Sequence, residues 1–123
     1  MGKINICSVL ENVTENKFFC NETVGIINDN KIKYVDKLVT VVITIESDEL
    51  TIVRRSKEYE IVLPLKENET LDGIYNIQSL GSLELNVHTI KLVIEDNLIE
   101  VEYEMIMDKE NKTKFKFKLE YGE

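Results

Sequence analysis

The chain has 123 residues, of which 23 are acidic and 15 basic, so its net charge at pH 7 is −8. A field of this sign repels phosphate backbones and anionic membrane surfaces, and neither nucleic acids nor membranes are therefore expected partners. The sequence contains no alanine and no tryptophan but is rich in Ile, Val, Thr and Tyr, which argues against a helical protein. A chain of this length is expected to form one domain, residues 1–123, with a core of its own.

Alternation of apolar and polar residues predicts ten β-strands and an all-β protein. The predicted strands are 3–14, 17–27, 31–36, 39–46, 50–57, 58–64, 71–79, 82–94, 98–107 and 113–121. Tight turns between successive strands favour a single antiparallel up-and-down β-barrel of about eight to ten strands. A two-layer sandwich is the alternative.

The first two predicted strands have an irregular pattern. Phe18 and Phe19 are adjacent and cannot both face one core, so one of them is expected to point outward or to lie in a bulge. An exposed aromatic side chain beside a sheet edge invites pairing with another chain. A turn near residues 15–16 places Cys7 opposite Val24 rather than Cys20, and neither a disulfide nor a zinc site is expected.

Arg54 is the most informative residue of the middle of the chain. It has the same parity as Leu50 and Ile52, so it can point into the barrel. An inward arginine can hold a ligand carboxylate through two hydrogen bonds. The alternative is a position at the rim, where its charge reaches water beside Arg55.

The strand predicted at 82–94 changes parity. In residues 83–87 the apolar side chains lie at odd-numbered positions, whereas in residues 90–94 a series of apolar side chains lies at even-numbered positions. A β-bulge produces this change, and His88 or Thr89 is expected to be the extra residue. With a turn at 96–97, this places Ile90 opposite Tyr103.

The last hairpin is specified by charge. In residues 98–121, one parity carries apolar side chains. The other parity carries glutamates in the first strand and lysines in the second. Folding about Lys109 places Glu104 opposite Lys114, and the register is well specified because a one-residue slip would bury this charged face.

Residues 75–89, YNIQSLGSLELNVHT, resemble the tyrosine, small-Gly-small, alternating Leu/Glu, valine, aromatic, threonine run of the YwiB-like family. The segment IESDELTIVR at 45–54 is similar to the acidic turn and arginine-ending strand of that family, and Val24-Gly25 followed by KYVD at 33–36 fits its second hairpin. The resemblance covers nearly the whole chain. It implies a bacterial protein of unknown function with a closed, lipocalin-like (calycin) barrel. The chain departs from the family at Arg55-Ser56, where a glycine usually follows the arginine, and at His88, where tyrosine is usual.

The sequence offers little for catalysis. His88 is its one histidine, and its expected cross-strand neighbour, Met105, can neither orient an imidazole nor accept its proton. No GxGxxG, Walker or HExxH motif occurs. We therefore expect no enzyme, no cofactor and no metal.

The candidate ligand-binding residues are Arg54, Tyr75, His88 and Tyr103. The two tyrosines are inward by parity, and such residues are more often core residues whose hydroxyl is satisfied at the edge. His88 is either a polar group in a pocket or a bulge residue at the rim. The leading hypothesis is a non-enzymatic barrel that binds a small apolar or acidic ligand. The alternative is a protein-interaction or structural module with a side-chain-filled barrel, either monomeric or a weak homodimer through a strand edge. Without a signal-peptide pattern, the expected location is the cytoplasm.

Overall fold

The computed structural model describes residues 2–108 and 110–123. The described residues form ten strands and no helix, as predicted. The strands are β1 (Gly2–Asn12), β2 (Lys17–Asn28), β3 (Lys31–Asp36), β4 (Val39–Ile45), β5 (Glu49–Arg55), β6 (Tyr59–Lys66), β7 (Thr70–Ile77), β8 (Gly81–Glu95), β9 (Leu98–Ile106) and β10 (Lys112–Gly122).

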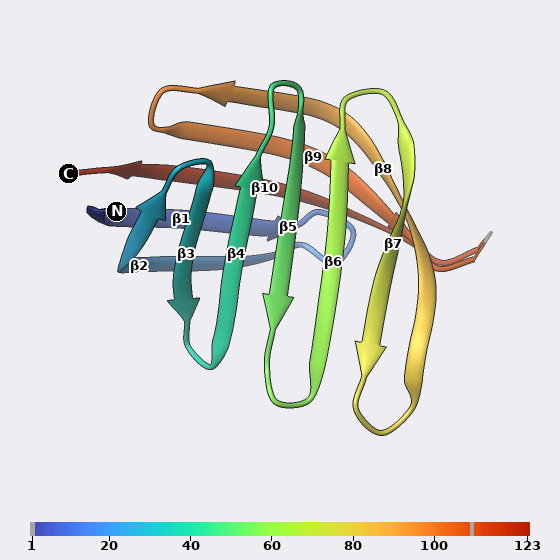
Figure 1. Cartoon of the computed structure of the whole chain (residues 1–123). Coiled ribbons are helices and arrows are strands. Elements are labelled where there is room, and N and C mark those ends of the chain that lie inside the picture. The colour runs from blue at the N-terminus through green and yellow to red at the C-terminus, as the bar shows by residue number, and fades with distance from the viewer. Residues whose placement is uncertain (1, 109) are drawn as a thin grey trace.

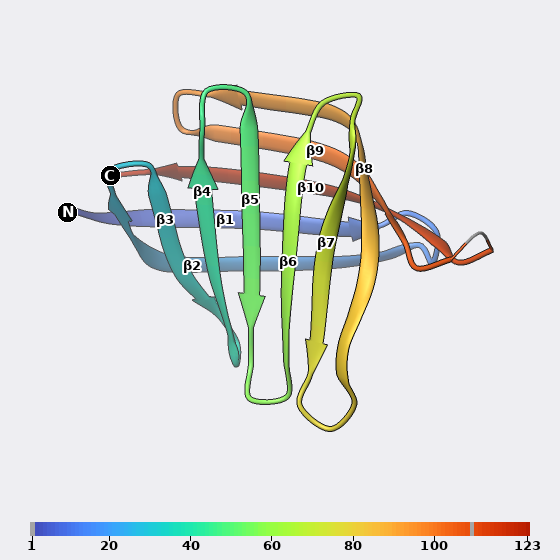
Figure 2. The same ribbon diagram turned by 45° about the vertical axis from the view of Figure 1, so that its right-hand side comes forward.

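The strands form a closed up-and-down barrel. Each strand pairs antiparallel with its neighbour in sequence, and β1 pairs with β10 to close the sheet. The predicted all-β barrel is therefore confirmed. The barrel is flattened: β3 to β7 run across β1, β2, β9 and β10, and the long strand β8 bends from one layer to the other (Figures 1 and 2). We call the first group the front layer and the second the back layer.

The charged register of the last hairpin is confirmed. Glu104 lies opposite Lys114, and Glu102 lies opposite Lys116. Glu102 Oε1 is 3.6 Å from Lys114 Nζ and 3.7 Å from Lys116 Nζ. Such exposed pairs stabilise by less than about 1 kcal/mol each, so they select the register more than they hold the sheet. Lys109, about which this hairpin was predicted to fold, lies outside the described residues.

The bulge in β8 is present, but one residue later than predicted. Thr89 pairs with Tyr103 and Lys91 pairs with Glu102, so the extra residue is Ile90. The prediction of His88 or Thr89 as the extra residue, and of Ile90 opposite Tyr103, is wrong. The cause is the β6–β7 turn: Asn68 N donates to Thr89 O at 2.8 Å, and Thr89 N donates to Glu69 O at 3.1 Å. These bonds keep Thr89 in the same register and with the same inward parity as the first half of β8.

Aliphatic side chains from both layers fill the middle of the barrel. Every second residue of most strands is buried, as the alternation predicts. The fully buried hydrophobic side chains are Ile32, Val41, Ile43, Leu50, Ile52, Leu65, Val87, Ile99 and Leu119. Polar interior residues are therefore exceptions that require an explanation.

The β1–β2 hairpin differs from the prediction in register. Cys7 lies opposite Glu22 rather than Val24, because the turn occupies residues 13–16 and is centred earlier than predicted. Both cysteines are free, as expected, but they are exposed and not partly buried. Phe18 lies opposite Glu11 on the outer face, and Phe19 lies opposite Leu10 on the inner face, yet both aromatic side chains are exposed.

The two layers separate along β2. Pairing between β2 and β3 is recorded only for Ile26, Ile27 and Asn28. At Gly25 the strands are in close contact, since a Cβ there would lie 2.7 Å from the carbonyl oxygen of Lys33. Beyond this point β3 turns away, and the ends of the front-layer strands project past β2 (Figures 1 and 2). The inner face of these projecting ends is therefore only partly covered by the back layer.

Candidate functional site

Arg54 occupies an inner position near the end of β5. The two preceding inner residues of the strand, Leu50 and Ile52, are buried in the core, whereas Arg54 is half-buried. Its direct neighbours are Val41 on β4 and Ile61 on β6. The predicted inward parity is confirmed, and the residue lies where the front layer begins to project beyond the back layer.

The charge of Arg54 acts on two phenols from opposite layers. Burial raises the pKa of Tyr34 on β3 and raises the pKa of Tyr103 on β9 to about 12, because the anionic phenolate is disfavoured away from water. In both cases the positive charge of Arg54 opposes this rise and lowers the pKa. The guanidinium group therefore lies close enough to both phenols for its charge to lower their pKa values.

Three buried polar side-chain atoms lack a hydrogen-bond partner among the described residues. They are Tyr34 Oη, Thr89 Oγ1 and Asn21 Nδ2. Thr89 is fully buried directly opposite Tyr103. Asn21 faces Ser8, whose hydroxyl lies close enough to Tyr34 to lower the pKa of that phenol. An unpaired buried polar atom costs about 1–3 kcal/mol, and such atoms are expected where a ligand or water supplies the missing partner.

Apolar side chains continue from Arg54 towards solvent. Ile61, Tyr75 and Leu83 occupy successive inner positions on β6, β7 and β8, and Leu83 is 40% exposed. The ring of Tyr75 meets that of Tyr59 edge-on, with centroids 6.0 Å apart. A cation with an apolar row leading away from it suits an acid that has an apolar body.

His88 does not belong to this cluster. It lies on the outer face, opposite Thr70 on β7 and Glu104 on β9, and its Nδ1 is 2.9 Å from Thr70 Oγ1. The expectation that Met105 is its cross-strand neighbour is wrong, because Met105 pairs with Val87. The reason is the position of the bulge: the parity change comes after Thr89, so His88 keeps the outward parity of the first half of β8.

The structure thus places Arg54 close enough to Tyr103 to lower the pKa of its phenol, places Tyr75 on the row of residues beside Arg54, and places His88 on the outer face. Sequence reasoning missed Tyr34, Ser8, Asn21 and Thr89. Tyr34 shares parity with the buried Ile32, and Ser8 shares parity with the buried Ile4 and Ile6. The inward direction of both side chains could therefore be predicted from the sequence. The effect of the Arg54 charge on Tyr34 could not.

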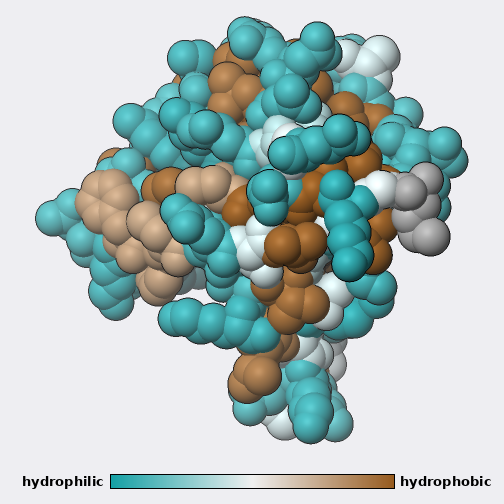
Figure 3. Space-filling model, turned by 90° about the vertical axis from the view of Figure 1, so that its left-hand side faces the viewer, coloured by the Kyte–Doolittle hydropathy of each residue, from teal (hydrophilic) through white to brown (hydrophobic). Residues whose placement is uncertain are grey.

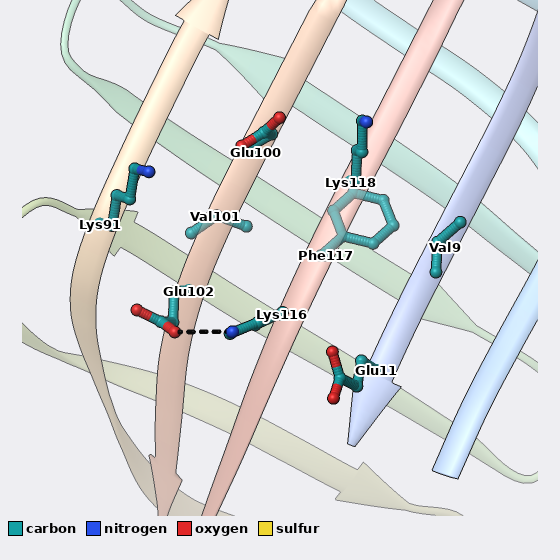
Figure 4. Close-up of a pocket in the computed structure, with 9 residues that line it drawn as sticks. All are labelled: Val9, Glu11, Lys91, Glu100, Val101, Glu102, Lys116, Phe117 and Lys118. Carbon is teal, nitrogen blue, oxygen red and sulfur yellow. Dashed lines mark ion pairs between the residues drawn. The ribbon is translucent and has the colours of Figure 1, made fainter. Parts of the chain in front are cut away.

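A second feature is a hollow of about 380 Å³ on the outer face of β1, β9 and β10 (Figure 4). The side chains drawn there carry balanced charges, since three lysines accompany three glutamates, and Glu102 pairs with Lys116 across the sheet. The hollow is lined by Val9, Glu11, Lys91, Glu100, Val101, Glu102, Lys116, Phe117 and Lys118. Because the charges balance, it has weaker selectivity for an anion than Arg54.

Two other classes of feature, a metal site and a membrane-spanning helix, are absent from the described part of the chain. No group of three or more His, Cys, Asp or Glu side chains there is placed to hold a metal ion. No helix among residues 2–108 and 110–123 has the length and apolar character needed to cross a membrane.

The chain forms a closed ten-stranded antiparallel barrel in which the charge of a half-buried arginine lowers the pKa of two buried phenols. The chain belongs to the family described as "Domain of unknown function (DUF1934)", whose model matches residues 4–119. Its structure is similar to the crystal structure of the ywiB protein from Bacillus subtilis, with a TM-score of 0.60 and 16% sequence identity over 98% of this chain and 91% of that chain. At this identity the likeness shows the barrel fold alone. No curated protein matches the chain.

Proposed function

We propose that this protein is a non-enzymatic binding barrel that holds a small, partly apolar acid, with Arg54 as the anchor for the carboxylate. The single observation that carries the proposal is the half-buried inner position of Arg54, from which its charge lowers the pKa of the buried phenols of Tyr34 and Tyr103. A carboxylate there would gain charge-assisted hydrogen bonds from a guanidinium group that water screens only partly.

The two arginines of the chain are adjacent but differ in their partners. Arg55 lies on the outer face, where its Nε is 2.6 Å from Glu60 Oε2. Among the described residues, no ion pair or hydrogen bond involves the side chain of Arg54. Arginine is almost never fully buried without a partner, and a bound carboxylate would supply the counter-charge for the buried part of Arg54.

A binding role also agrees better with the chemistry of His88 than an enzymatic role does. Thr70 and Glu104 flank this histidine, but all three lie on the outer face, and Thr70 is exposed. Catalytic groups need a site that excludes water and positions a substrate. We therefore propose no catalytic role for His88.

We expect hexanoate to raise the melting temperature of the wild-type protein more than hexanol or hexylamine does. Arg54→Ala should weaken hexanoate binding about tenfold to a hundredfold, because a charge-assisted hydrogen-bond pair contributes about 1.5–3 kcal/mol. Arg54→Lys should recover part of the affinity, since an ammonium keeps the charge but not the planar fork. Isothermal titration and thermal shift measure both effects.

Arg55→Ala is the matched control, since it removes the same side chain at the adjacent, outward position. It should leave hexanoate binding unchanged. Equal effects of the two substitutions, or equal binding of hexanoate and hexanol, would contradict a carboxylate anchor at Arg54.

A further inference from the structure

The side of β2 that faces away from β1 is another feature of the barrel, which we call the free edge of β2. From Lys17 to Val24 the strand pairs with β1 along one side, and on the other side no strand pairing is recorded for the described residues. Gly25 marks the point where β3 separates from it. The backbone groups on this side form an unpaired row that can accept another strand.

Natural edge strands are usually protected by charges, proline or bulges. Here the edge instead carries exposed apolar side chains on both faces: Phe18 is 62% exposed, Phe19 is 50% exposed and Val24 is 58% exposed. On the side of the molecule that carries the chain termini, apolar side chains lie among hydrophilic ones and extend onto the lobe that projects below (Figure 3). Both faces of an added strand would therefore find apolar contacts.

The projecting ends of the front layer decide where an added strand would lie. In both ribbon views these ends extend past β2 on the side of its free edge (Figures 1 and 2). A strand paired with this edge would continue the back layer beneath them. Its inward side chains would face half-buried residues such as Ile61 and Tyr75.

The size of the edge favours a single extended segment over a second copy of the chain. Residues 17–24 make a strand about 27 Å long, and a sheet edge about 10 Å deep then offers about 270 Å². A stable complex between globular proteins buries about 800 Å² on each partner. An extended segment requires less area because backbone hydrogen bonds supply much of its affinity.

Charge selects the chemistry of that segment. The outer face at this edge carries Glu22 on β2 and, on β1, Glu11 opposite Phe18. The chain as a whole has a net charge of −8. Both features favour a segment with basic side chains on its outward positions, through cross-strand pairs and through attraction at a distance.

We propose that the edge of β2 binds an extended, basic segment of a partner protein, in which apolar side chains facing inward alternate with Lys or Arg facing outward. The segment adds to the back layer as a strand beside residues 17–24. This interaction goes beyond the proposed ligand binding, although the added strand would face Ile61 and Tyr75, which also belong to the apolar row beside Arg54.

The test uses the full chain and a synthetic peptide of alternating valine and lysine, as long as residues 17–24. We expect saturable binding by fluorescence anisotropy, together with slowed amide hydrogen exchange confined to β2. A peptide of alternating valine and glutamate should bind more weakly, and an N-methylated valine–lysine peptide should not bind. Glu22→Lys should weaken binding of the valine–lysine peptide about threefold or more, because an attractive cross-strand pair becomes repulsive.

Glu84→Lys, an exposed substitution of the same kind on β8, is the matched control and should leave binding unchanged. Absence of binding at millimolar peptide, or protection outside β2, would overturn the proposal. Sedimentation showing a dimer whose β2 amides are already protected would assign the edge to a second copy and would overturn it as well.

Discussion

Replacing Gly73 with alanine is expected to lower the free energy of unfolding by about 3 kcal/mol, the upper end of the usual cost of overpacking a core. A Cβ at this position would lie 2.7 Å from the carbonyl oxygen of Val62 and 2.9 Å from Leu85 Cδ1. The carbonyl belongs to the backbone of β6 and cannot move without displacing that strand. The gain from a less flexible unfolded chain, about 0.4–1 kcal/mol, offsets only part of this cost.

Gly25→Ala should have a comparable effect, since its Cβ would lie 2.7 Å from the carbonyl oxygen of Lys33. Gly122→Ala is the control, because no atom lies within 4 Å of the added Cβ, and its effect should stay within about 0.5 kcal/mol. Urea unfolding followed by circular dichroism measures all three. A Gly73→Ala protein as stable as Gly122→Ala would show that β6 and β7 are not packed as described.

Alkaline pH is expected to destabilise the protein through Tyr103. The pKa of its phenol is about 12 in the folded barrel, against about 10 in the unfolded chain. A raised pKa means that the folded state favours the neutral phenol. The stabilisation is therefore fully present below pH 10 and is lost as the pH rises towards 12. A shift of this size corresponds to about 2–3 kcal/mol.

Tyr103→Phe should remove this part of the pH dependence. The stacked contact with Phe115, with ring centroids 5.4 Å apart, does not require the hydroxyl, so the variant should remain folded. Unfolding free energies of both proteins between pH 9 and 12 provide the comparison, and lysines and other tyrosines contribute equally to both. Parallel curves would mean that Tyr103 is not buried in the barrel.

Period-two alternation was sufficient to predict the strands and the last hairpin. The opposed Glu and Lys strands allow one register only, and the structure has Glu104 opposite Lys114 as predicted. The bulge was located less well. Its position depends on two hydrogen bonds, one from Asn68 N to Thr89 O and one from Thr89 N to Glu69 O. These contacts join the β6–β7 turn to β8 and leave no periodic signal in the sequence.

The same distinction applies to the candidate site. Parity predicted that Arg54 and Tyr103 face inward, because it depends only on residues within one strand. It could not show that the charge of Arg54 acts on both Tyr34 and Tyr103. These tyrosines come from opposite layers, and only the closed, flattened barrel places both within reach of that charge. The incorrect placement of His88 followed directly from the one-residue error in the bulge.

Stability and binding are expected to oppose each other in the interior of the barrel. The middle is filled by aliphatic side chains, whereas Tyr34, Thr89 and Asn21 contribute buried polar atoms without partners. Such atoms lower stability unless a ligand pairs with them. A carboxylate bound at Arg54 would therefore stabilise the fold in proportion to its affinity.

The most direct test of the central claim is the NMR signal of the arginine side chains. The chain contains two arginines, Arg54 and Arg55, so its spectrum has two Nε–Hε signals that single substitutions can assign. During titration with hexanoate, the Arg54 signal should shift to saturation while that of Arg55, paired with Glu60, stays in place. A stationary Arg54 signal at saturating hexanoate, or a shift of Arg55 alone, would contradict an interior carboxylate site.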